Sequence, residues 1–158
     1  MPIKLVNIDD RLVHGQIATT WVKDYNIESI IIVSDKVAND PVQKSVAGLA
    51  VPGIKVTIFE VEKFLEVISK TPIKKITMVL FTNPCDVLTC VERGFQVDYL
   101  NVSGMRFNDE RTRLHKNMSV TPAEREALNQ LLARGIPCFM QTTTRDEKYN
   151  IADLLKNA

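Results

Sequence analysis

The chain has 158 residues, enough for a single domain spanning residues 1–158 with its own hydrophobic core. Its 20 Lys and Arg residues nearly balance its 19 Asp and Glu residues, so no global positive field draws it onto nucleic acid, and its three widely spaced cysteines exclude a disulfide framework. No apolar run approaches the ~20 residues that span a bilayer and no secretory leader is visible, so we expect a cytoplasmic protein.

Short apolar runs alternate with helical patterns along the whole chain. Strands are predicted at Ile3–Ile8, Ser29–Val33, Ile54–Phe59, Lys75–Phe81, Asp98–Val102, Asn117–Val120 and Pro137–Thr142. Helices are predicted at Gln16–Tyr25, after Asp40-Pro41, at Val61–Ser69, from Asn83-Pro84 to Arg93, from Thr121-Pro122 to Arg134, and at Asn150–Lys156. Residues 104–116 are expected to form a long polar loop. This alternation predicts an α/β fold: an open, mainly parallel β-sheet flanked by helices on both faces.

In such folds, ligands bind beyond the carboxyl ends of the strands. The first predicted strand is followed there by DDRLVHGQ, residues 9–16, and a helix begins at about Gln16. His14 therefore lies beside the amino end of a helix, where unpaired N–H groups favour an anion. Gly15 allows the backbone to approach that anion closely. We predict that Gly15, Gln16 and Asp9 contribute to a phosphate-binding site.

The same segment predicts phosphoryl-transfer chemistry centred on His14. A largely neutral imidazole can attack phosphorus, and Arg11 offers a planar fork suited to phosphate oxygens. Asp9 or Asp10 is expected to accept the other ring N–H and orient the ring, so His14, Arg11 and Asp10 are the predicted catalytic residues. No nucleotide-binding motif and no ligand cluster for a metal is visible, so no cofactor or metal is expected. The phosphoryl group is therefore expected to come from another protein.

The DDRLVHGQ stretch closely resembles the first-loop signature of mannose/sorbose-family IIB components of the bacterial phosphoenolpyruvate:sugar phosphotransferase system. The resemblance covers the whole chain, and further matching motifs follow in the family's order. These motifs are Ser34-Asp35, Asn39-Asp40-Pro41-Val42, Phe81-Thr82-Asn83-Pro84, Asn101-Val102, Gly104-Met105 and Ser119-Val120. The chain departs from the family at Ser103-Gly104, where Gly-Gly is usual, and at Glu110-Arg111, where Gly-Lys is common.

The resemblance implies an open, mainly parallel sheet with an antiparallel strand near one edge. It also implies a protein-phosphohistidine–sugar phosphotransferase of the EC 2.7.1 class. His14 would take the phosphoryl group from the IIA component and deliver it to a sugar held by the membrane IIC and IID components. The protein would then associate peripherally with the inner face of the cell membrane. The stretch beginning Asn83-Pro84 favours the mannose or sorbose branch, and homo-oligomerisation stays open.

A phosphocarrier needs a surface on which its partner proteins dock. Val13, Met105 and Phe107 are apolar residues near the predicted site, and we consider them as docking residues, with ordinary core or loop packing as the alternative. A non-catalytic module that binds an anion or a phosphoprotein through Arg11 and the helix end is the second functional hypothesis. Sugar hydrolysis by Asp9 and Asp10 is disfavoured, because adjacent residues rarely place two carboxylates across one substrate.

Overall fold

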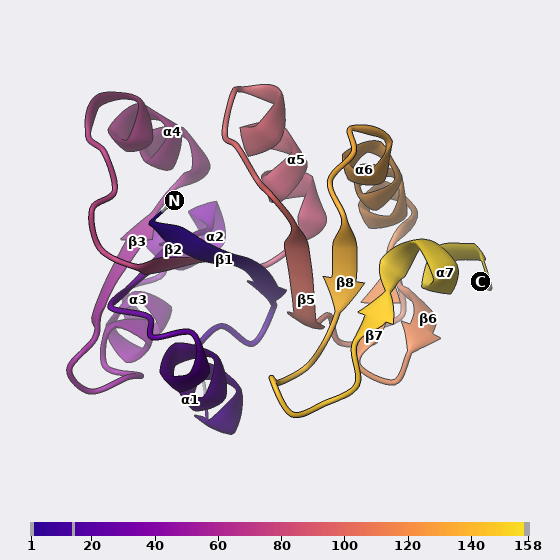
Figure 1. Cartoon of the computed structure of the whole chain (residues 1–158), viewed down its shortest axis with the longest axis horizontal. Coiled ribbons are helices and arrows are strands. Elements are labelled where there is room, and N and C mark those ends of the chain that lie inside the picture. The colour runs from indigo at the N-terminus through magenta and orange to yellow at the C-terminus, as the bar shows by residue number, and fades with distance from the viewer. Residues whose placement is uncertain (1, 14, 157–158) are drawn as a thin grey trace.

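The computed structural model describes residues 2–13 and 15–156, without the side chains of residues 16–19 (Figure 1). The predicted nucleophile His14 therefore lies outside the described residues. The chain forms a seven-stranded sheet and a separate two-stranded sheet. In spatial order the large sheet contains β3 (Lys55–Phe59), β2 (Ser29–Val33), β4 (Thr77–Phe81), β1 (Ile3–Asp9), β5 (Leu100–Gly104), β8 (Cys138–Met140) and β9 (Tyr149–Asn150).

All neighbouring strands of the large sheet are parallel except β8 and β9, which are antiparallel. The predicted α/β class and the antiparallel strand near one edge are therefore confirmed. Every residue of β4 and of β5 is buried, as expected of inner strands that helices or loops cover on both faces. β1 lies between these two strands, so its carboxyl end sits at the middle of the sheet edge.

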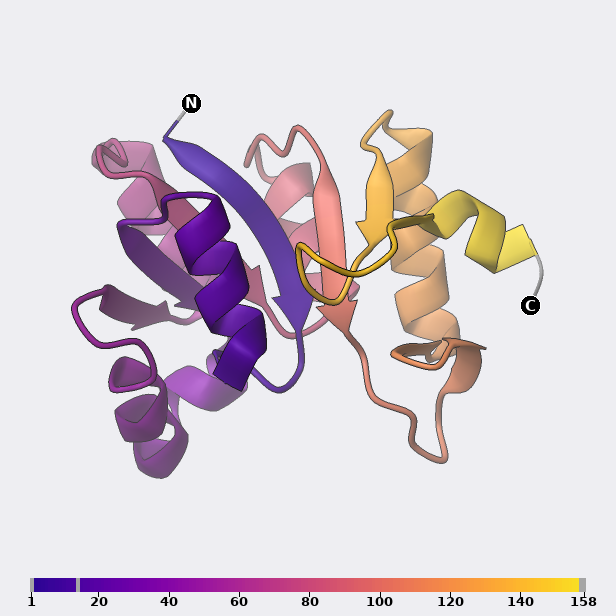
Figure 2. The same ribbon diagram turned by 60° about the horizontal axis from the view of Figure 1, so that its bottom comes forward.

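The helices divide between the two faces of the sheet (Figures 1 and 2). Their bounds are α1 (Gly15–Asp24), α2 (Asp35–Ala38), α3 (Pro41–Gly48), α4 (Val61–Lys70), α5 (Pro84–Glu92), α6 (Pro122–Ala133) and α7 (Ile151–Lys156). One core cluster contains Trp21 of α1 and Ala47 of α3, and the other contains Phe64, Val87 and Leu128 of α4, α5 and α6. The connections that leave β1 and β4 thus go to opposite faces, which opens a crevice at their carboxyl ends.

The predicted polar loop at residues 104–116 is partly wrong. Thr112–His115 form β6, which pairs antiparallel with β7 (Met118–Val120). The first two residues of β6 are exposed, so the strand lacks the continuous apolar run by which the inner strands were recognised. The short helix α2 was also not predicted; Ser34 caps it by accepting a hydrogen bond from the backbone N of Val37.

The sequence signals at helix starts are confirmed. Pro41, Pro84 and Pro122 each begin a helix behind a capping residue. Thr121 and Glu124 form the capping box expected for α6, with each side chain bonded to the backbone of the other residue. Among the described residues, no helix is long and apolar enough to cross a membrane.

Candidate functional site

The loop that follows β1 turns sharply before α1 begins. The backbone N of Leu12 donates to the carbonyl of Asp9 at 3.0 Å, closing a tight turn. Leu12 has a φ of 65°, in the left-handed region that a leucine rarely adopts, and Gly15 follows with a φ of 43°. Two left-handed residues therefore flank the segment that contains His14, and backbone strain of this kind tends to gather at functional sites.

Asp9 positions the guanidinium of Arg11. Asp9 is only 1% exposed, and its Oδ1 accepts hydrogen bonds from the backbone N of Arg11 at 2.9 Å and from its Nε at 3.3 Å. Both terminal nitrogens of Arg11 make no hydrogen bond with the described part of the chain, and the side chain is 33% exposed. This burial does not favour the predicted direct contact between the Asp9 carboxylate and a phosphate, which stays a prediction.

Gly104 makes room for this arginine. Gly104 pairs in register with Asp9, and a β-carbon at position 104 would lie 2.8 Å from Nη2 of Arg11. Any other residue at position 104 would displace the guanidinium of Arg11 from its place against the β5 backbone. The sequence showed Gly104 only as part of a family motif, and its contact with Arg11 depends on two strands that are distant along the chain.

Asp10 holds a different pair of arginines. Its Oδ2 accepts from the backbone N of Arg106 at 2.9 Å and from Nη1 of Arg111 at 2.8 Å, while its Oδ1 accepts from Nε of Arg106 at 3.3 Å. The segment after β5 is thereby tied to the loop after β1. Both oxygens of Asp10 already accept from arginines. In the structure this predicted catalytic residue therefore positions Arg106 and Arg111.

Arg111 links Asp10 to the start of α6. Its Nε and Nη2 donate to the two carboxylate oxygens of Glu124 at 3.0 and 2.8 Å, a bidentate pair whose side chains are each 9% exposed. Burial opposes the charge of Arg111, but hydrogen bonds and charge from Glu124 and Asp10 raise its pKa above the ordinary value. Arg111 therefore stays charged, and sequence patterns alone gave no sign of this pair.

Ser103 lies inside the protein, where the family usually has glycine. It is 0% exposed, and its Oγ accepts from Nδ2 of Asn7 at 2.9 Å and lies 3.1 Å from the Oδ1 of the same residue. Asn101 joins this buried network by donating to Asn7 at 2.9 Å and to the carbonyl of Gln141 at 3.1 Å. The hydroxyl therefore ties β1 to β5.

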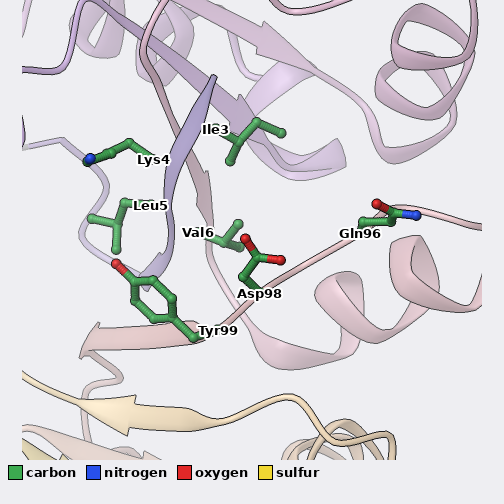
Figure 3. Close-up of a pocket in the computed structure, with 7 residues that line it drawn as sticks. All are labelled: Ile3, Lys4, Leu5, Val6, Gln96, Asp98 and Tyr99. Carbon is green, nitrogen blue, oxygen red and sulfur yellow. The ribbon is translucent and has the colours of Figure 1, made fainter. Parts of the chain in front are cut away.

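Two grooves flank the loop after β1 at the carboxyl edge of the sheet. One has a volume of 480 Å³ and runs between Leu12, Lys36, Asn83 and Arg106. The other has a volume of 450 Å³ and lies between Arg11, Val13 and α3. At the opposite edge, a cavity at the amino ends of β1 and β5 measures only 40 Å³ (Figure 3), and a second one beside Pro2, Ile68 and Phe95 measures 260 Å³. The larger of these four spaces are thus at the edge that carries the predicted site.

The predicted docking residues are only partly at the surface. Val13 is 7% exposed and Met105 is 0% exposed, so both pack in the core, and the docking prediction is wrong for them. Phe107 is 55% exposed. The structure adds an apolar stripe on and just after α3 that was not predicted: Val42, Val46 and Leu49 are 70%, 64% and 80% exposed. Their spacing of four and three residues is the signature that was available in the sequence.

Two further predicted phosphate-binding residues, Gly15 and Gln16, lie at the start of α1. Gly15 is exposed at the first position of α1, one residue before the predicted start, and Gln16 follows in the helix with its side chain outside the described set.

In the ranges 2–13 and 15–156, no three His, Cys, Asp or Glu side chains are grouped to hold a metal. Burial raises the pKa of both Cys90 and Cys138 to about 12, so neither is a ready nucleophile.

Comparison with known families decides the identity of this fold and loop. The model of the family described as "PTS system sorbose subfamily IIB component" matches residues 3–158. The chain belongs to this family of IIB components. The resemblance inferred from DDRLVHGQ is therefore confirmed, and the chain is a component of the sugar phosphotransferase type.

Three similar proteins place this IIB component more closely. The mannose-specific EIIAB component of Escherichia coli K12 is 40% identical over 157 residues, which are 98% of this chain but 49% of that protein. The chain thus spans about half the length of this relative. The sorbose-specific EIIB component of Klebsiella pneumoniae is 38% identical over 97% of this chain and 94% of its own. The crystal structure of the IIBSor domain of the K. pneumoniae sorbose permease matches with a TM-score of 0.93 and 36% identity, covering 100% and 98% of the two chains.

Proposed function

We propose that this IIB component is a phosphocarrier that accepts a phosphoryl group on His14 and passes it to a sugar. The donor is the phosphohistidine of a IIA component, and the acceptor is a sugar hydroxyl presented by membrane IIC and IID components. The observation that carries the proposal is the guanidinium of Arg11, whose Nε donates to the buried carboxylate of Asp9 and whose side chain lines the groove beside Val13.

In the first step, an imidazole nitrogen of His14 forms a bond to phosphorus while the nitrogen–phosphorus bond of the donor breaks. In the second step, the sugar hydroxyl oxygen forms a bond to phosphorus, its proton passes to water, and the bond to His14 breaks with its electron pair returning to the imidazole nitrogen. Such transfers depend mainly on positioning and on neutralising the phosphoryl oxygens. Arg11 supplies the charge, and Gly104 keeps its guanidinium in place.

The ring of His14 also needs a partner that sets its orientation. Both oxygens of Asp10 are used by Arg106 and Arg111, so of the two predicted carboxylates we assign the orienting role to Asp9. Asp10 then acts through the segment after β5, which it fixes against the loop. A loop held in this way reaches the transfer geometry without a further ordering cost.

Docking of IIA is proposed on the apolar residues that surround the loop. Val42 and Val46 line the groove that Arg11 and Val13 also line, and Phe107 lies on the segment tied to Asp10. Apolar residues beside a polar centre exclude water from the transfer and give a partner a surface to bury. For the sugar we propose mannose or sorbose, which appear in the names of two relatives; the names of other relatives contain fructose and N-acetylgalactosamine.

The test is ³¹P NMR after incubation with phosphoenolpyruvate and the upstream carriers, including IIA. We expect an acid-labile, base-stable phosphoimidazole signal that the His14→Gln variant lacks, with an unchanged fold by circular dichroism. The signal also identifies the nitrogen that is phosphorylated. A His14→Gln protein that still takes up one phosphoryl group would overturn the proposal. Binding of inorganic phosphate without any such mark would favour the non-catalytic anion-binding module.

A further inference from the structure

Arg106 is held beside the loop by several contacts to Asp10. Its backbone N and its Nε donate to the carboxylate of Asp10 at 2.9 and 3.3 Å, and its Nη2 donates to the carbonyl of Asp10 at 3.4 Å. The side chain is nevertheless 66% exposed. Nη1 makes no hydrogen bond with any residue that the structure describes. The guanidinium is thus anchored on one side and open on the other.

Arg106 repeats the arrangement of Arg11. The consecutive carboxylates Asp9 and Asp10 each accept from the Nε of one arginine, at 3.3 Å in both pairs. In each pair the carboxylate fixes the inner side of the guanidinium and leaves terminal N–H groups for another acceptor. The two arginines come from different strand ends, Arg11 after β1 and Arg106 after β5. Their similarity appears only after folding.

Both arginines line the same groove of 450 Å³, together with Val13, the residue before His14. They are the only cationic residues among the described residues that line it. Its single acidic residue, Asp10, is already paired with arginines. A phosphoryl group carries about 1.5–2 negative charges and three acceptor oxygens, more than one planar fork can satisfy. Two guanidinium groups facing one groove meet that demand.

We propose that Arg106 is a second phosphoryl-binding residue, which donates to the phosphoryl group on His14 together with Arg11. The inference rests on the proposed phosphocarrier function. Arg106 exchanges no proton in the step: it stays protonated and donates hydrogen bonds while the phosphoryl group moves between imidazole nitrogens.

The competing explanation is that Arg106 only ties the segment after β5 to Asp10. Arg93 provides a matched control, because it is also an exposed arginine paired with one carboxylate, Glu62, but sits at the far end of α5. We compare Arg106→Gln, Arg106→Lys and Arg93→Gln with the unchanged protein. Thermal unfolding of each variant confirms that the fold is retained.

The first measurement is the rate of phosphoryl transfer from phosphorylated IIA to the protein. Arg106→Gln is expected to slow the transfer about 100-fold, as removal of one charge-stabilising donor does elsewhere. Arg106→Lys keeps the charge but loses the planar fork, so its transfer rate is expected to lie between those of Arg106→Gln and the unchanged protein. The rate of Arg93→Gln is expected to match that of the unchanged protein. Equal rates for Arg106→Gln and Arg93→Gln would overturn the inference.

The second measurement detects direct contact without any partner protein. In the isolated phosphorylated protein, the Nε–H NMR signals of Arg11 and Arg106 are expected to shift relative to the unphosphorylated form, and that of Arg93 to stay in place. A tether alone leaves the Arg106 signal unmoved, which would also overturn the inference. Failure of the unchanged protein to become phosphorylated contradicts the proposed function itself. Phosphorylation with an unaffected Arg106 contradicts only the role of Arg106.

Discussion

Two ion pairs of the molecule use charge in opposite ways. Between α4 and α5, Arg93 and Glu62 form an ion pair on the surface, with side chains 51% and 73% exposed. At the carboxyl edge, Arg111 and Glu124 form a bidentate pair with side chains that are each 9% exposed, and Asp10 joins it. The buried pair costs desolvation free energy on folding, and it holds the loops beside the predicted phosphoryl site.

The largest expected effect comes from breaking the buried pair. Glu124→Gln leaves the charge of Arg111 without its bidentate partner in a nearly closed site, and we expect a loss of about 3 kcal/mol in the free energy of unfolding. Glu62→Gln, in the pair between α4 and α5, is expected to cost less than about 1 kcal/mol, because that pair is exposed to water. Urea unfolding measures both. Equal losses would show that the two ion pairs do not differ as described.

A smaller effect is expected from Gly104→Ala. The new β-carbon would lie 2.8 Å from Nη2 of Arg11, so the guanidinium must move while the backbone stays as it is. We expect the rate of phosphoryl transfer to His14 to fall about 10- to 100-fold. Gly48→Ala is the matched control, because a β-carbon there meets nothing within 4 Å, and its rate is expected to be unchanged. An undiminished rate in Gly104→Ala would show that the position of the Arg11 guanidinium beside residue 104 does not matter for the transfer.

The smallest effect is expected from Ser103→Ala. Loss of the buried hydroxyl leaves Asn7 short of a partner, and we expect the free energy of unfolding to fall by about 1–2 kcal/mol. Thr77→Val removes a comparably buried hydroxyl from the amino edge, where it donates to the carbonyl of Lys75. Neither variant is expected to change the transfer rate. A slower transfer in Ser103→Ala alone would show that the hydroxyl also contributes to the phosphoryl site.

Local signals made the fold and the central loop predictable. The uniformly apolar runs of the inner strands and the capping residues at Asp40, Asn83 and Thr121 correspond to the observed strands and helices. The segment from Asp9 to Gly15 was found because its residue types lie together along the chain. β6 was missed because an exposed four-residue strand that pairs only with its neighbour carries little apolar pattern.

The sequence by itself determined the α/β alternation, the position of the loop after β1 and the family of the chain, because each depends on residues close together in the chain. Only the tertiary structure decided that Asp9 serves Arg11, that Asp10 binds Arg106 and Arg111, and that Gly104 makes room for a guanidinium. These contacts join residues up to 101 positions apart. They form because parallel strands bring their carboxyl ends to one edge, where loops distant in sequence share one polar surface.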